Sequence, residues 1–241
     1  MRTIIWFIYF WLYLIVLLPR MYRVKKMFAQ GQTRQADELT SKTVVCWANR
    51  LLGLAGVKIT VSGQEYLPKT PCVFVCNHQG YFDIPIVLTQ LGKPHSILAK
   101  EETAKIPMIR TWMEYLHCVF IDRHDVRQSA AALNKAIENI KKGYSVVIFP
   151  EGTRSRGDRV GEFKPGGFRA AQKTGVPIVP VCIDGSYKVM EMNHMMIKPA
   201  QVKVTILPMI STEEFSKEDF KLVGEQVREM IIECKENKVM L

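Results

Sequence analysis

The sequence predicts an α/β fold in which a mostly parallel or mixed central sheet is flanked by helices on both faces. Three observations support this fold class. From Gly56 onward, short β-rich runs alternate with helical patterns. Several runs are apolar throughout, which indicates strands buried on both faces. With 241 residues, 48% of them hydrophobic, the chain is long enough to form a substantial core.

The N-terminus is the most hydrophobic part of the chain. Residues 4–18 contain no charged side chain. As a helix they would be about 22 Å long, which is short against a hydrocarbon core of about 30 Å. Their Trp and Tyr side chains favour the membrane interface. Pro19 is expected to end this helix, and four cations follow: Arg20, Arg23, Lys25 and Lys26.

Three interpretations of this apolar segment are open. A cleaved signal peptide is disfavoured, because only Arg2 precedes the run and no small-residue cleavage site follows it. A single span extended to about Tyr22 and a monotopic helix dipping into one leaflet both fit. A second, largely apolar helix over about residues 34–55 favours a hairpin in the cytosolic leaflet, although a core helix fits that segment as well. We expect membrane-associating helices in residues 1–56, at the cytoplasmic face, and an α/β domain in residues 57–241.

Seven strands and three further helices are expected in that domain. The predicted strands are Val57–Ser62, Cys72–Cys76, Ser96–Ala99, Cys118–Ile121, Ser145–Phe149, Ile178–Ile183 and Val202–Leu207. A helix should follow Asp125, because Gln128 completes a capping box, and it should end at Gly143. A short helix is expected over residues 165–174, and a last amphipathic helix should begin near Ser216.

The net charge of +10 suits an anionic partner: nucleic acid, an anionic membrane surface or a phosphorylated substrate. The apolar N-terminus favours membrane and lipid, so no nucleic-acid partner is expected. The six cysteines form no CxxC pair and no zinc-ligand spacing. We therefore expect reduced cysteines, no bound metal and no cofactor.

Four segments at predicted strand ends carry the polar side chains that chemistry needs, since open α/β sheets bind ligands there. In the first, residues 77–83 (NHQGYFD), His78 follows a buried strand and Asp83 lies five residues on. Such a pair suits an imidazole that takes up a proton and is held in one tautomer. For this segment alone, a structural histidine in a turn is the simpler interpretation.

Another of these segments, residues 147–155 (VIFPEGTRS), places a turn after a buried strand. Gly152 allows the backbone to turn sharply and approach a ligand. Arg154 presents a fork of donors suited to phosphate oxygens, and Thr153 adds a hydroxyl. A surface turn would not explain why Glu151 and Arg154 stand together after so apolar a strand.

The other two segments are less specific. Lys100 and Arg123 each follow an apolar strand, where they would either face an anion or form ordinary surface charge. Residues 176–181 (VPIVPV) contain prolines that disfavour a central strand. We expect this apolar segment to form a wall of the site or part of the hydrophobic core.

In this order and spacing, the four segments resemble the four motifs of the glycerolipid acyltransferases, and most closely those of the 1-acyl-sn-glycerol-3-phosphate (lysophosphatidate) acyltransferases. NHQGYFD matches the motif N-H-x-x-x-x-D, and FPEGTRS matches the third motif without change. AKEE…IP…FIDR and VPIVPV match the second and fourth. The resemblance runs from about Val57 to Leu207. Arg110 and His117 depart from it, because the family often has glycines there.

The resemblance implies a reaction and a set of residues. A fatty acyl group would pass from acyl carrier protein or coenzyme A to the sn-2 hydroxyl of 1-acyl-glycerol 3-phosphate, giving phosphatidic acid. His78 would be the general base and Asp83 would orient it. The expected substrate-binding residues are Asn77, Lys100, Arg123, Glu151, Gly152, Thr153, Arg154 and Lys164. Backbone NH groups near Gly80 or Gly152 are candidate oxyanion donors.

Three alternatives remain open at this point. One is a sibling acyltransferase that uses glycerol 3-phosphate or a lyso-aminolipid as acceptor. Another is a membrane-binding protein without catalysis, which the intact His78 and Asp83 disfavour. The last is a metal-dependent hydrolase, which lacks third and fourth ligands at suitable spacing.

Overall fold

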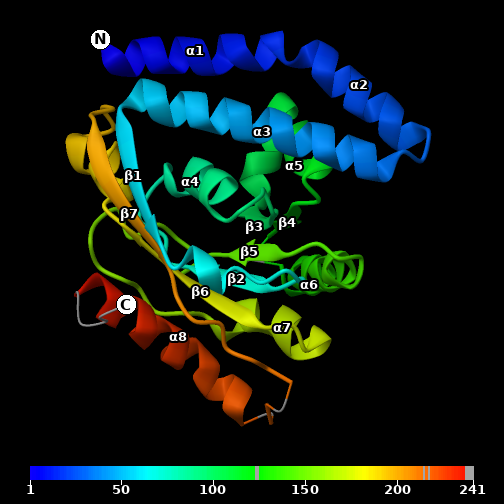
Figure 1. The fold of residues 1–241 in the computed structure, drawn as a ribbon, viewed down its shortest axis with the longest axis vertical. Coiled ribbons are helices and arrows are strands. Elements are labelled where there is room, and N and C mark those ends of the chain that lie inside the picture. Colours follow the sequence, from blue (N-terminus) through cyan, green and yellow to red (C-terminus); the bar gives the residue numbers. More distant parts are fainter. Residues whose placement is uncertain (123–124, 214, 217, 237–241) are drawn as a thin grey trace.

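Seven strands form one mixed sheet with helices on both faces, which confirms the predicted fold class (Figure 1). The computed structural model describes residues 1–122, 125–213, 215–216 and 218–236. The strands are β1 (Val57–Ser62), β2 (Val73–Cys76), β3 (Ser96–Lys100), β4 (Val119–Ile121), β5 (Val146–Ile148), β6 (Ile178–Asp184) and β7 (Ala200–Ile206). They lie in the order β1-β7-β6-β2-β5-β3-β4.

Five neighbouring strands of this sheet run parallel. β2 pairs in parallel with both β5 and β6, and β3 pairs in parallel with both β5 and β4. β6 and β7 pair antiparallel, while β1 and β7 are parallel. The carboxyl ends of β2 to β6 therefore meet at one edge of the sheet, where ligand sites of α/β proteins form.

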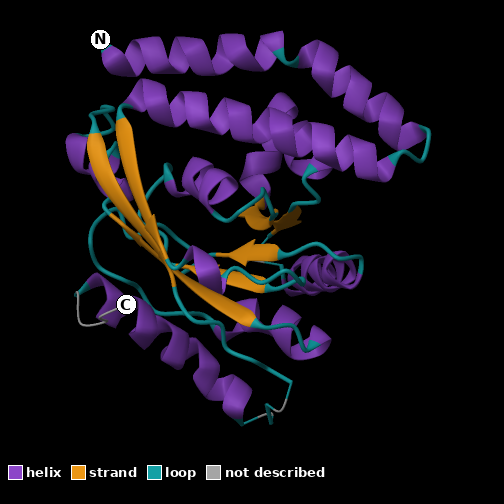
Figure 2. Ribbon diagram, in the orientation of Figure 1, coloured by secondary structure: helices purple, strands orange, loops and turns teal. Residues whose placement is uncertain are grey.

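The helices form two layers on opposite faces of the sheet (Figures 1 and 2). One layer holds α1 (Arg2–Val16), α2 (Leu18–Ala29), α3 (Thr33–Ala55), α4 (Asp83–Gln90) and α5 (Pro107–Tyr115). The other holds α6 (Val126–Lys141), α7 (Arg169–Thr174) and α8 (Asp219–Lys235). Alternate residues of β2 supply each layer: Phe74 and Cys76 pack in the first core, and Val73 and Val75 in the second. A strand buried on both faces has to be apolar throughout, as β2 is.

The expected helix boundaries in the α/β part are largely confirmed. Asp125 caps α6 by accepting hydrogen bonds from the NH groups of Arg127 and Gln128. The segment predicted as one short helix begins as a 3-10 turn over Pro165–Phe168 and continues as α7. Ser216 and Asp219 bond reciprocally ahead of α8, as a capping box should.

The N-terminal region contains one more helix than the sequence predicted. The apolar helix α1 ends at Val16, and α2 begins at Leu18 after a bend of 44°. Pro19 was expected to end helical structure, but it lies in the first turn of α2, where proline has no lost hydrogen bond to compensate. The chain then returns as α3 beneath α1, and the Trp6 indole NH donates to the Leu51 carbonyl at 2.9 Å.

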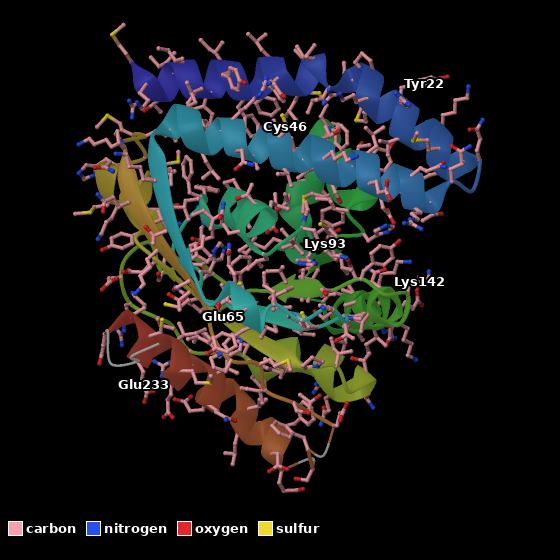
Figure 3. All side chains as sticks on the ribbon, in the orientation of Figure 1. Tyr22, Cys46, Glu65, Lys93, Lys142 and Glu233 are labelled. Atoms are coloured by element: carbon pink, nitrogen blue, oxygen red, sulfur yellow. The ribbon has the colours of Figure 1, made fainter. Side chains whose placement is uncertain are left out.

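The outer face of α1 is covered by large apolar side chains. These exposed residues are Ile4, Ile5, Phe7, Ile8, Trp11, Leu12, Ile15 and Val16. Tyr22 of α2, labelled in Figure 3, is also exposed. Among the described residues, no one helix has both the length and the hydropathy of a membrane span. The bent pair α1 and α2 meets these criteria when taken together.

Candidate active site

The residues expected to carry chemistry gather at the carboxyl edge of the five parallel strands. His78 follows β2, the turn from Phe149 to Gly152 follows β5, and Lys100 ends β3. β6 also ends here, at Asp184, and Ser186 comes two residues later. Segments more than 70 residues apart in the chain thus meet at one place.

The imidazole of His78 is fixed by a carboxylate and an aromatic ring. Its Nδ1 lies 2.7 Å from Oδ2 of Asp83, the first residue of α4. Since a carboxylate only accepts, Nδ1 carries the proton, and within the described part of the chain Nε2 has no hydrogen-bond partner. The ring stacks on Phe149 with centroids 4.3 Å apart. The His78 side chain is 17% exposed and that of Asp83 is fully buried, so only the imidazole can meet a substrate.

Four donors surround the buried carboxylate of Asp83. Oδ2 accepts the NH groups of Gln79 at 2.7 Å and Gly80 at 2.8 Å as well as the imidazole. Oδ1 accepts the hydroxyl of Ser186, which is itself fully buried. Such a set of donors offsets the cost of burying a carboxylate without water. Sequence reasoning missed Ser186, because nothing in its spacing links it to a carboxylate 103 residues earlier.

Glu151 ties the third motif to the histidine turn. Its Oε1 accepts the backbone NH of His78 at 2.6 Å, and Oε2 accepts the NH of Gly161 at 2.9 Å. Burial raises the pKa of the Glu151 carboxyl, and the two NH donors oppose that rise. Two further backbone bonds join these loops: Ser155 NH to the His78 carbonyl and Arg156 NH to the Gln79 carbonyl. Glu151 therefore acts on the shape of the site.

This geometry bears on the expectations for Asn77, for the oxyanion donors and for Gly152. The Asn77 side chain is buried, and its amide both donates to and accepts from the Ile183 backbone at 2.8 Å. Asn77 therefore joins β2 to β6, and its buried amide binds backbone where a substrate ligand was expected. The NH groups of Gly80 and Gly152 themselves are engaged: the first donates to Asp83, and the second donates to the Phe149 carbonyl at 3.1 Å. That an NH group near either glycine binds the oxyanion stays a prediction. Gly152 does adopt the left-handed conformation expected of it, with φ of 76°.

Arg154 lies directly against the histidine turn. Its guanidinium carbon is 3.5 Å from the centroid of the Tyr81 ring, a cation–π contact. Its Nη1 is 3.6 Å from Oε1 of Glu191. The Arg154 side chain is 22% exposed, whereas that of Glu191 is 2% exposed. Glu191 was also missed from sequence, since it follows β6 by several residues and belongs to no motif.

The other expected ligands lie along the same edge. Lys100, Thr153 and Lys164 are exposed. Phe149, Gly152 and Lys164 contribute to the lining of a cavity of about 400 Å³. Arg123 lies outside the described residues.

Comparison with known proteins gives a matching family model, two relatives and one similar solved structure. The family model described as "Acyltransferase" matches residues 58–184. A probable 1-acyl-sn-glycerol-3-phosphate acyltransferase of Mycoplasma genitalium is 32% identical over 206 residues, covering 80% of this chain and 76% of that protein. A chloroplastic relative from Brassica napus is 43% identical over 135 residues, and the chain spans only 39% of its length. The crystal structure of the 1-acyl-sn-glycerophosphate acyltransferase from Thermotoga maritima superimposes with a TM-score of 0.73 at 26% identity, covering 94% of this chain and 97% of that one.

Proposed function

This chain belongs to the acyltransferase family, and we propose that it transfers a fatty acyl group from an acyl thioester to the sn-2 hydroxyl of 1-acyl-glycerol 3-phosphate, forming phosphatidic acid. The observation that carries the proposal is the His78–Asp83 pair, with Arg154 held against the same turn. Several relatives are named 1-acyl-sn-glycerol-3-phosphate acyltransferases, which supports this choice of acceptor.

The proposed chemistry is general base catalysis by His78. Nε2 takes the proton of the acceptor hydroxyl while that oxygen attacks the thioester carbonyl. The carbon–sulfur bond then breaks, and the thiolate leaves with the proton from the imidazolium. Asp83 keeps Nδ1 protonated and stabilises the positive charge that forms on the ring. No acyl-enzyme is needed, and a positioned base contributes about 10²–10⁴ to the rate.

In this proposal the acceptor's phosphate binds the cations of the sheet edge. Arg154 is the first of these, because its guanidinium is fixed against Tyr81 of the histidine turn and its side chain remains partly exposed. Lys100, at the end of β3, and Lys164, whose NH donates to the Pro150 carbonyl, are further candidates, together with Arg123. Glu151 and Gly152 shape the turn that carries Arg154.

The acyl donor is either acyl carrier protein or coenzyme A. The net charge of +10 suits the acidic surface of a carrier protein and the phosphates of coenzyme A alike. Both donors belong in the assay. The reaction as written needs no metal or cofactor.

We further propose that α1 and α2 hold the protein at the cytoplasmic face of a membrane. The exposed apolar face of α1 would enter the lipid, and the cations of α2 would meet anionic headgroups. A single-chain lipid could then reach His78 without crossing water. If α1 and α2 lie in one leaflet, the protein is monotopic. If the two helices together form a bent span, they cross the bilayer.

The test is an acceptor panel with the purified protein in mixed micelles. Lysophosphatidate, glycerol 3-phosphate and a lyso-aminolipid are each supplied with acyl-coenzyme A or acyl carrier protein. We expect kcat/KM to be highest for lysophosphatidate. Equal or higher kcat/KM for another acceptor would assign the chain to a sibling acyltransferase activity. No transfer to any of the three acceptors would indicate a membrane-binding protein without catalysis.

A further inference from the structure

Glu191 is a buried carboxylate beside the active site that the proposed reaction does not use. It begins a 3-10 helix, Glu191–Asn193, shortly after β6. Its Oε1 accepts the backbone NH of Tyr81 at 2.7 Å, a bond between residues 110 apart in the sequence. Burial raises the pKa of the Glu191 carboxyl, and the Tyr81 NH and Arg154 act in the opposite direction.

The second oxygen of Glu191 faces the catalytic turn. Oε2 is buried and has no hydrogen-bond partner among the described residues. A Cβ placed on Gly80 would lie 2.4 Å from it, far inside any normal contact. The carboxylate therefore fills the space that only a glycine at position 80 leaves open. It is held in place by the same turn that supplies two of the donors to Asp83.

The carboxylate and the Tyr81 ring hold Arg154 between them. Nη1 of Arg154 lies 3.6 Å from Glu191, and the guanidinium stacks on the ring at 3.5 Å. A guanidinium has five NH donors, so an ion pair through one nitrogen leaves others for a phosphate. Arginine loses much rotamer freedom when it binds a ligand, and a side chain fixed beforehand loses less.

We propose that Glu191 is a positioning residue that fixes the Arg154 guanidinium against Tyr81, ready for the acceptor's phosphate. The inference rests on the proposed function insofar as Arg154 is taken to bind that phosphate. Glu191 itself touches neither the hydroxyl nor the thioester. Glu191 therefore affects the affinity for the acceptor, and it does so by fixing the Arg154 guanidinium.

The test compares Glu191→Gln, Arg154→Ala and the double variant. The E191Q side chain would keep an oxygen for the Tyr81 NH but lose the charge that holds Arg154. We expect KM for lysophosphatidate to rise about tenfold in E191Q, a change of about 1.4 kcal/mol in binding, with kcat within about twofold of wild type. The dissociation constant of a short-chain lysophosphatidate, measured by calorimetry, should rise by the same factor. In the R154A background, E191Q should change neither constant further.

Each measured outcome either supports or overturns the positioning role of Glu191. Glu162→Gln, at an exposed position, is the matched control and should leave both constants unchanged. An unchanged dissociation constant in E191Q, or an equal effect with and without Arg154, would overturn the positioning role. If E191Q does not fold, Tyr81→Leu is the second variant. It removes the half-exposed aromatic ring on which the Arg154 guanidinium stacks, and it should raise KM for lysophosphatidate similarly. A wild-type protein that transfers nothing to lysophosphatidate would instead refute the proposed function. The calorimetric comparison would still test whether Glu191 positions Arg154 for binding the phosphate.

Discussion

Replacing Ser186 by alanine removes one donor from the buried carboxylate of Asp83. Both side chains are fully buried, so no bulk water can take the place of the lost hydroxyl. Oδ1 would be left without this partner, while the three donors to Oδ2 remain. The substitution tests whether the surroundings of Asp83 matter to catalysis as well as to folding.

The expected magnitude follows from the kind of hydrogen bond. A bond to a charged group contributes about 1.5–3 kcal/mol, so S186A should lower the free energy of unfolding by about 2 kcal/mol. For a protein of this size that is a fall in Tm of roughly 4–8 °C. The same bond stabilises the carboxylate that faces the imidazolium in the transition state. If about 1.4 kcal/mol of it is expressed there, kcat falls about tenfold.

The assay measures thermal unfolding and acyl transfer for S186A alongside Ser96→Ala. Ser96 is also buried, and its hydroxyl donates to the His117 carbonyl at 2.7 Å, but it begins β3 at the opposite edge of the sheet. S96A should lose stability and keep its kcat. Wild-type kcat in S186A, or an equal loss of kcat in S96A, would refute the reasoning.

Two further predictions concern pH and membrane binding. Burial lowers the pKa of His95 to about 4 from 6.5. The unfolded chain therefore binds more protons between these values, and stability should fall by about 3 kcal/mol as pH drops through that window. Urea unfolding at pH 7.5 and 5 should show about 2 kcal/mol of this loss in wild type and less in His95→Gln. Equal losses in the two proteins would contradict the prediction. Replacing Ile8 and Leu12, which are 55% and 57% exposed, by serine should weaken binding to anionic vesicles by about 2 kcal/mol, roughly 30-fold. Leu222→Ser on α8, 69% exposed, is the control, and equal losses would refute a membrane-facing α1.

The strands of this protein could be predicted because their hydrophobicity is local. Every predicted strand is present, and each boundary differs by at most two residues. The extra helix α2 was missed because Pro19 and the cations after it suggested the end of helical structure. Proline is tolerated in a first helical turn, and only the bend at Leu17 shows that a new helix begins.

The site was predictable only in part. His78 and Asp83 lie five residues apart, so their pairing is a local feature of one turn. Ser186 and Glu191 reach that turn from beyond β6, and only the packed sheet brings them there. Asn77 was expected among the ligands, but its amide binds the neighbouring strand, because a polar side chain at a strand end can bind backbone as readily as a ligand.

The central claim is that His78 is the base that activates the acceptor hydroxyl. The most direct measurement is release of free thiol from the acyl thioester, with and without lysophosphatidate, for wild type and His78→Ala. We predict acceptor-dependent release in wild type and a loss of about 10²-fold or more in the variant, with vesicle binding unchanged. The Tm of the variant should fall by an amount similar to that of S186A, because the imidazole is also a donor to the buried Asp83 carboxylate. Acceptor-dependent thiol release at the wild-type rate in His78→Ala would contradict the account.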